Sequence, residues 1–217
     1  MWNWDYAFSI LPQILSALKI TISATFVGFI LALFLGLIFS VLVRSDIKIV
    51  SLAVRGIIQF IRNTPLLVQL YFIFYVFPKI GISLKPFTAG VLGVGIHYST
   101  YLSEVFRSGI EAVPAGQWEV AKALNFSHIQ AWIKIILPQV IPPIIPVIGN
   151  YLITMFKETP LLSAITLVEI LQTAKILGAG SFRYLEGFTI VGIIFFLLSY
   201  PSSQLIKKLE VRLGAKN

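Results

Sequence analysis

The chain has 217 residues, of which 57% are hydrophobic and 12% are charged. A soluble domain is about 25% charged and could not bury so many apolar side chains, which excludes a soluble enzyme or a disordered segment and favours an integral membrane protein. The absence of cysteine excludes a disulfide framework and a cysteine nucleophile. The net charge of +8 fits membrane loops held on the cytoplasmic side and does not call for a nucleic-acid partner.

Five stretches of the chain carry few charges and are long enough to cross about 30 Å of hydrocarbon as helices. Their predicted bounds are 15–43, 56–78, 86–106, 135–157 and 185–206. Helices are required because lipid offers the backbone no hydrogen-bond partners, and the stretches do not alternate apolar and polar residues as barrel strands do. The sequence therefore predicts an all-α integral membrane protein with a single transmembrane domain, residues 1–217, and five spans.

Lysine and arginine are concentrated in the first connection, in the third connection and after the fifth stretch. With five spans these regions lie on one side of the membrane, and the positive-inside rule makes that side cytoplasmic. We therefore expect the N-terminus outside and the C-terminus in the cytoplasm. Residues 1–18 carry Asp5 and no basic residue, so we expect no cleaved signal.

Two connections are too long to be simple turns. Residues 108–134 mix apolar and charged side chains at helical spacing, which predicts a cytoplasmic helix or a helix that lies on the membrane surface. Residues 161–177, in the outer connection, are apolar enough to dip into the membrane or to lie at its surface. No internal repeat is apparent in the chain.

A charged pair stands at the end of the fourth stretch. Lys157 and Glu158 come directly before Thr159 and Pro160, and a proline cannot continue the hydrogen-bond ladder of a helix. A broken helix with charged residues predicts a solute site, whereas an ion pair at the membrane boundary explains the same residues equally well.

Other polar residues lie in or beside the apolar stretches. Thr154 is inside one of them, where a helix-packing hydrogen bond explains it as well as contact with a solute does. Glu104 and Arg62 flank other apolar stretches. A structural ion pair or a contact with lipid headgroups explains them as an alternative to contact with the solute. We retain Glu158, Lys157, Thr159, Thr154 and Glu104 as candidates for the substrate path.

Motifs for chemistry within the chain are missing. There is no Gly-x-x-x-x-Gly-Lys phosphate loop, so we do not expect the chain to bind ATP by itself. His97 and His128 lack both metal-ligand spacing and a recognisable serine or acid partner. We therefore predict no catalytic residue, no metal and no cofactor in this chain.

The third connection carries the most specific motif. Its residues match, in register, the pattern Glu-Ala-Ala, three residues, Gly, nine residues, Ile-x-Leu-Pro. The matching positions are Glu119, Ala121, Ile135, Leu137 and Pro138. Val120 replaces the middle alanine, and Asn125 replaces the glycine; because asparagine tolerates a left-handed helix end, we expect the turn to survive. This segment resembles the EAA loop of ABC importer permeases.

Further segments are similar to the polar amino-acid uptake family, the histidine, glutamine and arginine type of these permeases. They are residues 60–70, 101–110, 113–119 and 157–161. The resemblance extends from about residue 11 to residue 204 and implies an ABC type I importer permease in the cell inner membrane. Such a subunit moves polar amino acids into the cytoplasm by alternating access, and arginine, lysine or histidine would suit a carboxylate at Glu158 or Glu104.

The resemblance also implies partners. They are cytoplasmic ABC ATPase subunits that carry ATP and Mg, an extracytoplasmic amino-acid-binding protein, and a second copy or a similar permease, all at a lipid membrane. The residues implied in ATPase coupling are Glu111, Gly116, Gln117, Trp118, Glu119, Ala121, Leu124 and Asn125. The alternative is a secondary amino-acid transporter driven by an ion gradient, which has no need of this loop.

Overall fold

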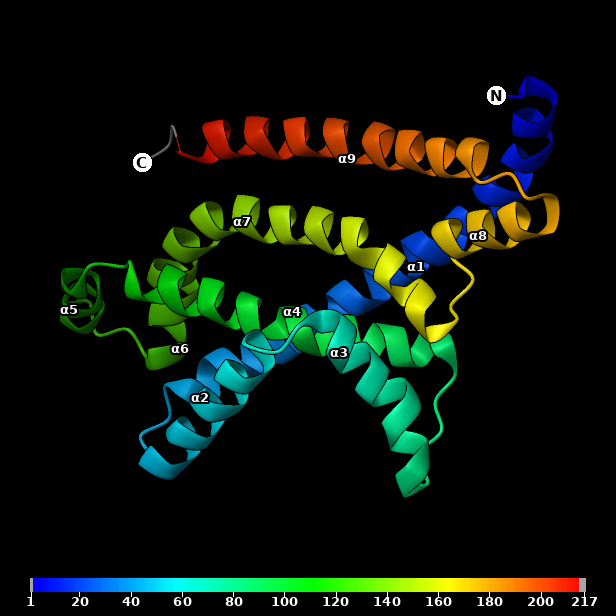
Figure 1. Cartoon of the computed structure of the whole chain (residues 1–217). Helices are drawn as coiled ribbons and strands as arrows, with labels where there is room; N and C mark the ends of the chain where they lie inside the picture. Colours follow the sequence, from blue (N-terminus) through cyan, green and yellow to red (C-terminus); the bar gives the residue numbers. More distant parts are fainter. Residues whose placement is uncertain (1, 215–217) are drawn as a thin grey trace.

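The structure is a computed structural model that describes residues 2–214, and these residues form helices and their connections without a strand (Figure 1). The long helices are α1 (Trp4–Val43), α2 (Lys48–Arg62), α4 (Pro86–Glu111), α7 (Leu137–Glu158) and α9 (Leu185–Gly214). The shorter ones are α3 (Leu66–Tyr71), α5 (Ala115–Ala123), α6 (His128–Ala131) and α8 (Ile170–Ser181). The predicted all-α class is confirmed.

Three helical segments of the described chain are long and apolar enough to cross a membrane. They are Trp4–Val43, His128–Ile165 and Leu185–Gly214. A fourth is added if the bent pair Lys48–Arg62 and Leu66–Ile80 forms one broken span. Helix α4 is less hydrophobic than these segments because it carries many glycine, serine, threonine and tyrosine residues. It is instead a buried helix, since 15 of its 26 residues are buried. The count of five spans and their orientation stay predictions.

The second predicted span, 56–78, is not one continuous helix. Helix α2 ends at Arg62, α3 begins at Leu66, and the two axes are bent by 101°. Pro65 has no N–H to donate, and its ring disfavours helical backbone at Thr64, so the chain breaks here. The expected single helix is therefore corrected to two helices joined by a sharp bend.

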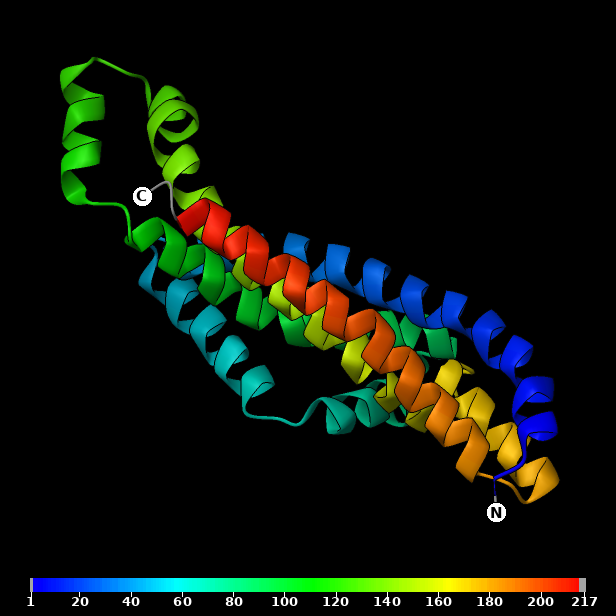
Figure 2. The same ribbon diagram turned by 90° about the horizontal axis from the view of Figure 1, so that it is seen from above.

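Helix α4 lies at the centre of the bundle and packs along most of its length on α1. Glycine allows this close approach, since a Cβ at Gly95 would lie 2.6 Å from the Cδ2 atom of Leu31. Helix α7 packs on both α4 and α9. Figure 2 shows α5 at one end of the bundle and the N-terminus, with α8 beside it, at the other end.

Candidate functional site

The predicted cytoplasmic helix is present as α5, which stands apart from the bundle (Figure 1). Helix α4 ends at Glu111, and Pro114, with a φ of −57° and a ψ of 140°, turns the chain into the new helix. Proline suits this place because the first N–H groups of a helix have no partner within it. A helix of nine residues is thus separated from α4 by a sharp turn.

Asn125 ends α5 in a left-handed conformation with a φ of 55°. The N–H of Phe126 donates to the carbonyl of Ala121 (3.0 Å), and the N–H of Asn125 donates to that of Lys122 (2.9 Å). This pair of bonds is the Schellman arrangement, which satisfies the last carbonyls of a helix. The expectation that asparagine preserves the turn is confirmed.

The residues implied in coupling divide into an outer and an inner set. Those exposed to solvent are Glu111, Gly116, Glu119, Leu124 and Asn125. Ala121 is only 2% exposed, so it supports α5 from within and is not available to a partner. The half-buried Trp118 packs its ring edge-on against Trp132, with the centroids 5.3 Å apart. Gln117 accepts a hydrogen bond from Gln139 at 3.2 Å, which ties α5 to the first turn of α7.

The predicted break after the fourth apolar stretch is also present. Helix α7 ends at Glu158, and the 3-10 turn Thr159–Ile165 follows. The hydroxyl of Thr159, a residue that is 1% exposed, donates to the carbonyl of Phe156 at 2.7 Å. Pro160 has no N–H that could bond to this carbonyl, so the Thr159 hydroxyl donates to it instead.

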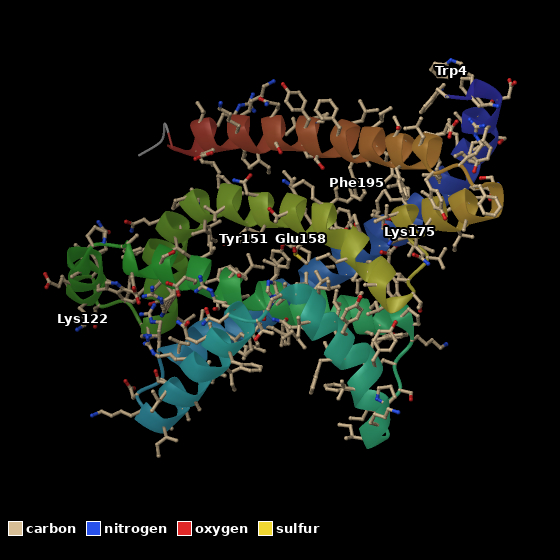
Figure 3. All side chains as sticks on the ribbon, viewed as in Figure 1. Trp4, Lys122, Tyr151, Glu158, Lys175 and Phe195 are labelled. Carbon is tan, nitrogen blue, oxygen red and sulfur yellow. The ribbon has the colours of Figure 1, made fainter. Side chains whose placement is uncertain are left out.

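A polar cleft of about 420 Å³ lies between the break at Glu158 and the bend after α2. It is lined by Arg62, Asn63, Thr64, Pro65, Leu66, Leu67, His97, Tyr101, Glu158 and Leu161. The carboxylate of Glu158 accepts a hydrogen bond of 2.6 Å from the hydroxyl of Tyr98. Figure 3 labels Glu158 and Tyr151 on α7, in the middle of the view.

Three tyrosine rings form one wall beside this carboxylate. Tyr98, Tyr101 and Tyr151 have ring centroids between 5.9 and 6.1 Å apart. The guanidinium of Arg62 lies 4.9 Å from the centre of the Tyr101 ring, a cation–π contact. The cleft is therefore lined by an anionic group, Glu158, a cationic group, Arg62, and one ring of this aromatic cluster, Tyr101.

The other residues predicted for the substrate path lie outside the lining of this cleft. Lys157 is exposed and borders a hollow against α9, because neighbouring residues of a helix point in different directions. Thr154 donates to the carbonyl of Asn150 at 2.9 Å, so its hydroxyl is used within the helix. Thr159 is buried beside the cleft. Of the five candidates for the substrate path, only Glu158 lines this cleft, and the solute site itself stays a prediction.

Glu104 forms an ion pair with Arg107, and Arg107 also binds Glu111. The structural alternative for Glu104, an ion pair, is therefore observed, although its partner is Arg107 and not Arg62. These three residues follow one another along the last turns of α4, toward the α5 end, and none of them lines the cleft.

A short repeated sequence borders the cleft on both sides. Residues 62–67 read Arg-Asn-Thr-Pro-Leu-Leu and residues 157–162 read Lys-Glu-Thr-Pro-Leu-Leu. Each copy breaks a helix at Thr-Pro, and in each the threonine hydroxyl donates to a carbonyl of the preceding turn, 2.7 Å away in both. The expectation of no internal repeat is wrong over these six residues, and the two copies lie on the same cleft.

Comparison with known proteins gives consistent matches over almost the whole chain. Residues 35–214 match the family described as binding-protein-dependent transport system inner membrane component. A probable amino-acid ABC transporter permease protein, y4tG of Sinorhizobium fredii, is 44% identical over 97% of this chain and 94% of its own. The arginine transport system permease protein ArtQ of Bacillus subtilis is 31% identical, and the match covers 99% of this chain and 100% of ArtQ.

A solved structure has the same fold. It is described as the crystal structure of an amino acid ABC transporter with histidines, and the matched chain superposes with a TM-score of 0.90 at 33% identity. The match covers 98% of this chain and 99% of that one. The helical arrangement, including the separate α5, is therefore that of a known class of transporter subunit.

Proposed function

Since the chain belongs to the family of binding-protein-dependent transport system inner membrane components, as an inner-membrane amino-acid ABC transporter permease by homology, we propose that it forms the path by which polar amino acids enter the cytoplasm. Uptake by alternating access would use ATP hydrolysed on separate ATPase subunits, which hold the nucleotide and Mg, while this chain contributes no catalytic residue. The observation that carries the proposal is that Glu158 and Arg62 both line one polar cleft.

The two charges of the cleft suit the two charges of an α-amino acid. Glu158 would bind the α-ammonium group, and Arg62 would bind the α-carboxylate, both through charge-assisted hydrogen bonds. Tyr98 orients the carboxylate by its hydrogen bond, so little rearrangement is needed when the solute arrives. The side-chain ammonium or guanidinium of lysine or arginine would suit the same carboxylate, and the proposal therefore extends to cationic amino acids.

Coupling to ATP would occur at α5. The exposed side chains of Glu119 and Leu124 would dock in a cleft of the ATPase, and Trp118 against Trp132 would transmit its movement toward α7. A second copy of the chain or a similar permease would complete the path, and an extracytoplasmic amino-acid-binding protein would deliver the solute.

On the side away from α5, a hydrogen bond joins two segments of the chain. The hydroxyl of Tyr75, beyond α3, donates to the carbonyl of Ala164 in the 3-10 turn at 3.1 Å. This bond joins the segments that follow the two Thr-Pro breaks. We propose that alternating access includes the parting of these segments while α5 is driven by the ATPase.

The experiment is reconstitution of the chain with its ATPase and binding protein in liposomes. Amino-acid uptake should require ATP and the binding protein, and it should persist when proton and sodium gradients are collapsed by ionophores. Uptake that runs on an ion gradient without the ATPase would support the secondary transporter instead. A secondary transporter has no use for a protruding helix such as α5, which is why the ATP-driven reading is preferred.

A further inference from the structure

Helix α1 is longer than a membrane span requires. Its 40 residues would extend about 60 Å at about 1.5 Å per residue, whereas the hydrocarbon layer is about 30 Å thick. Residues 20–43 are free of charge and would by themselves cover about 36 Å at the same rise. Exposed polar residues, Gln13, Ser16 and Lys19, interrupt the apolar run before residue 20, and the first turns of α1 precede the predicted span that begins at residue 15.

The first turns of α1 leave the direction of the span. Pro12 lies inside the helix, where it removes one hydrogen bond and favours a bend. Figures 1 and 2 agree that the N-terminal turns point away from the rest of α1, at the end of the bundle opposite α5. These turns are thus placed to run across the end of the bundle.

This bent segment is fixed on the protein by one of its faces. Ile10 is buried in a cluster with residues of α8 and α9, and Ala7, on the preceding turn, is buried as well. The N–H of Asn3 donates to the carboxylate of Glu186 at 2.9 Å, and the Tyr6 hydroxyl donates to the carbonyl of Leu177 at 3.1 Å. The exposed side chains described next are therefore held in a defined direction.

A second face of the segment is aromatic and exposed. Trp4 is 66% exposed and Phe8 is 64% exposed, and their rings stack with centroids 6.0 Å apart. Figure 3 shows Trp4 on the outside of the bundle. The face is continued along α1 by the exposed Leu15 and Ile22. Asp5 and Ser9 are exposed on the polar side of the same turns.

We propose that Trp4 and Phe8 insert at the boundary between headgroups and acyl chains of the phospholipid bilayer, so that the first two turns of α1 form an interfacial anchor. Tryptophan is enriched at this depth because its ring is apolar and its N–H is polar. An amphipathic segment of this kind lies in the plane of the membrane. Because α8 and α9 are bonded to the segment, the anchor fixes the depth of the α8–α9 connection. The inference does not depend on the solute that is carried.

The lack of native cysteine allows a direct test on the full chain. Single-cysteine variants W4C, F8C and D5C would be labelled with a nitrobenzoxadiazole fluorophore and reconstituted in phosphatidylethanolamine–phosphatidylglycerol vesicles. Nitroxide lipids labelled near the headgroup should quench positions 4 and 8 several-fold more than position 5, and aqueous iodide should quench position 5 most. I22C provides the reference for a deeper site.

Two results would overturn the proposal. Equal iodide quenching at positions 4, 5 and 8 would leave the aromatic face in water. Weak quenching of positions 4 and 8 by both agents would mean that protein covers the aromatic face. If quenching then rises when the binding protein is removed, the binding protein covers the face; if it rises when the chain is diluted, a second copy of the chain does.

Discussion

Tyr98, in the central helix α4, donates a hydrogen bond of 2.6 Å to Glu158, the last residue of α7. Tyr98 is 4% exposed, whereas Glu158 lines the polar cleft. The carboxylate is therefore held from the buried side and reachable from the cleft side. A group bound by Glu158 is in this way connected to the helix that packs on α1 and α7.

Replacing Glu158 with glutamine should weaken the response to every transported amino acid and weaken it most for arginine and lysine. A hydrogen bond to a charged group contributes about 1.5–3 kcal/mol, so the apparent affinity should fall roughly tenfold or more. The assay is solute-stimulated ATPase activity and uptake in liposomes. Lys157→Gln is the matched control, since Lys157 lies outside the cleft, and unchanged affinity in Glu158→Gln would remove Glu158 from the solute site.

Replacing Tyr98 with phenylalanine removes the hydroxyl that orients the carboxylate and keeps the ring in the aromatic wall. We expect an increase of roughly fivefold in the apparent KM for the solute, which corresponds to about 1 kcal/mol, with ATPase coupling retained. Tyr151→Phe is the control, because Tyr151 contributes to the wall without contacting Glu158. Equal effects of the two variants would mean that the hydrogen bond between Tyr98 and Glu158 has no specific role in solute binding.

Replacing Glu119 with lysine should uncouple transport from ATP hydrolysis. The residue is exposed on α5, so the folding stability should change by no more than about 0.5 kcal/mol. A reversed charge in a docking cleft costs several kcal/mol, and we expect uptake to fall more than tenfold while the variant still reaches the membrane. Membrane yield, ATPase pull-down and uptake would be measured together. Normal uptake would exclude Glu119 from the ATPase interface.

Asn125 can be tested by two substitutions with opposite expectations. Asn125→Gly suits the φ of 55° and should leave uptake unchanged. Asn125→Val places a branched side chain in the left-handed conformation, at a cost of about 1–2 kcal/mol, and should lower coupled ATPase activity by several-fold. Binding of the solute should be the same in both variants, and a valine variant with full coupling would show that this turn is not required.

The sequence predicted the features that depend on local chemistry. The end of α7 before Pro160, the separate helix after Pro114 and the left-handed Asn125 each follow from the conformational limits of one or two residues. The bend at Thr64–Pro65 depends on the same limits, but the surrounding apolar residues suggested a continuous span.

The composition of the cleft depends on contacts between distant segments and was predicted only in part. Glu158 was identified because it is a charge in an apolar run. Its bond with Tyr98, and the presence of Arg62 on the same cleft, require the packing of α2, α4 and α7, which no spacing in the chain encodes. Lys157, which the sequence places beside Glu158, does not line the cleft, because adjacent helical residues point in different directions.

The threonine hydroxyls at the two Thr-Pro breaks have a consequence for movement within a lipid environment. A bare peptide carbonyl in hydrocarbon costs several kcal/mol, which would normally prevent a membrane helix from pivoting at a proline. Thr64 and Thr159 each bring a donor that belongs to the break itself and reaches back to the preceding turn. A bend at either break would therefore leave a carbonyl of the preceding turn hydrogen-bonded. The chain has two such breaks, and they border one cleft.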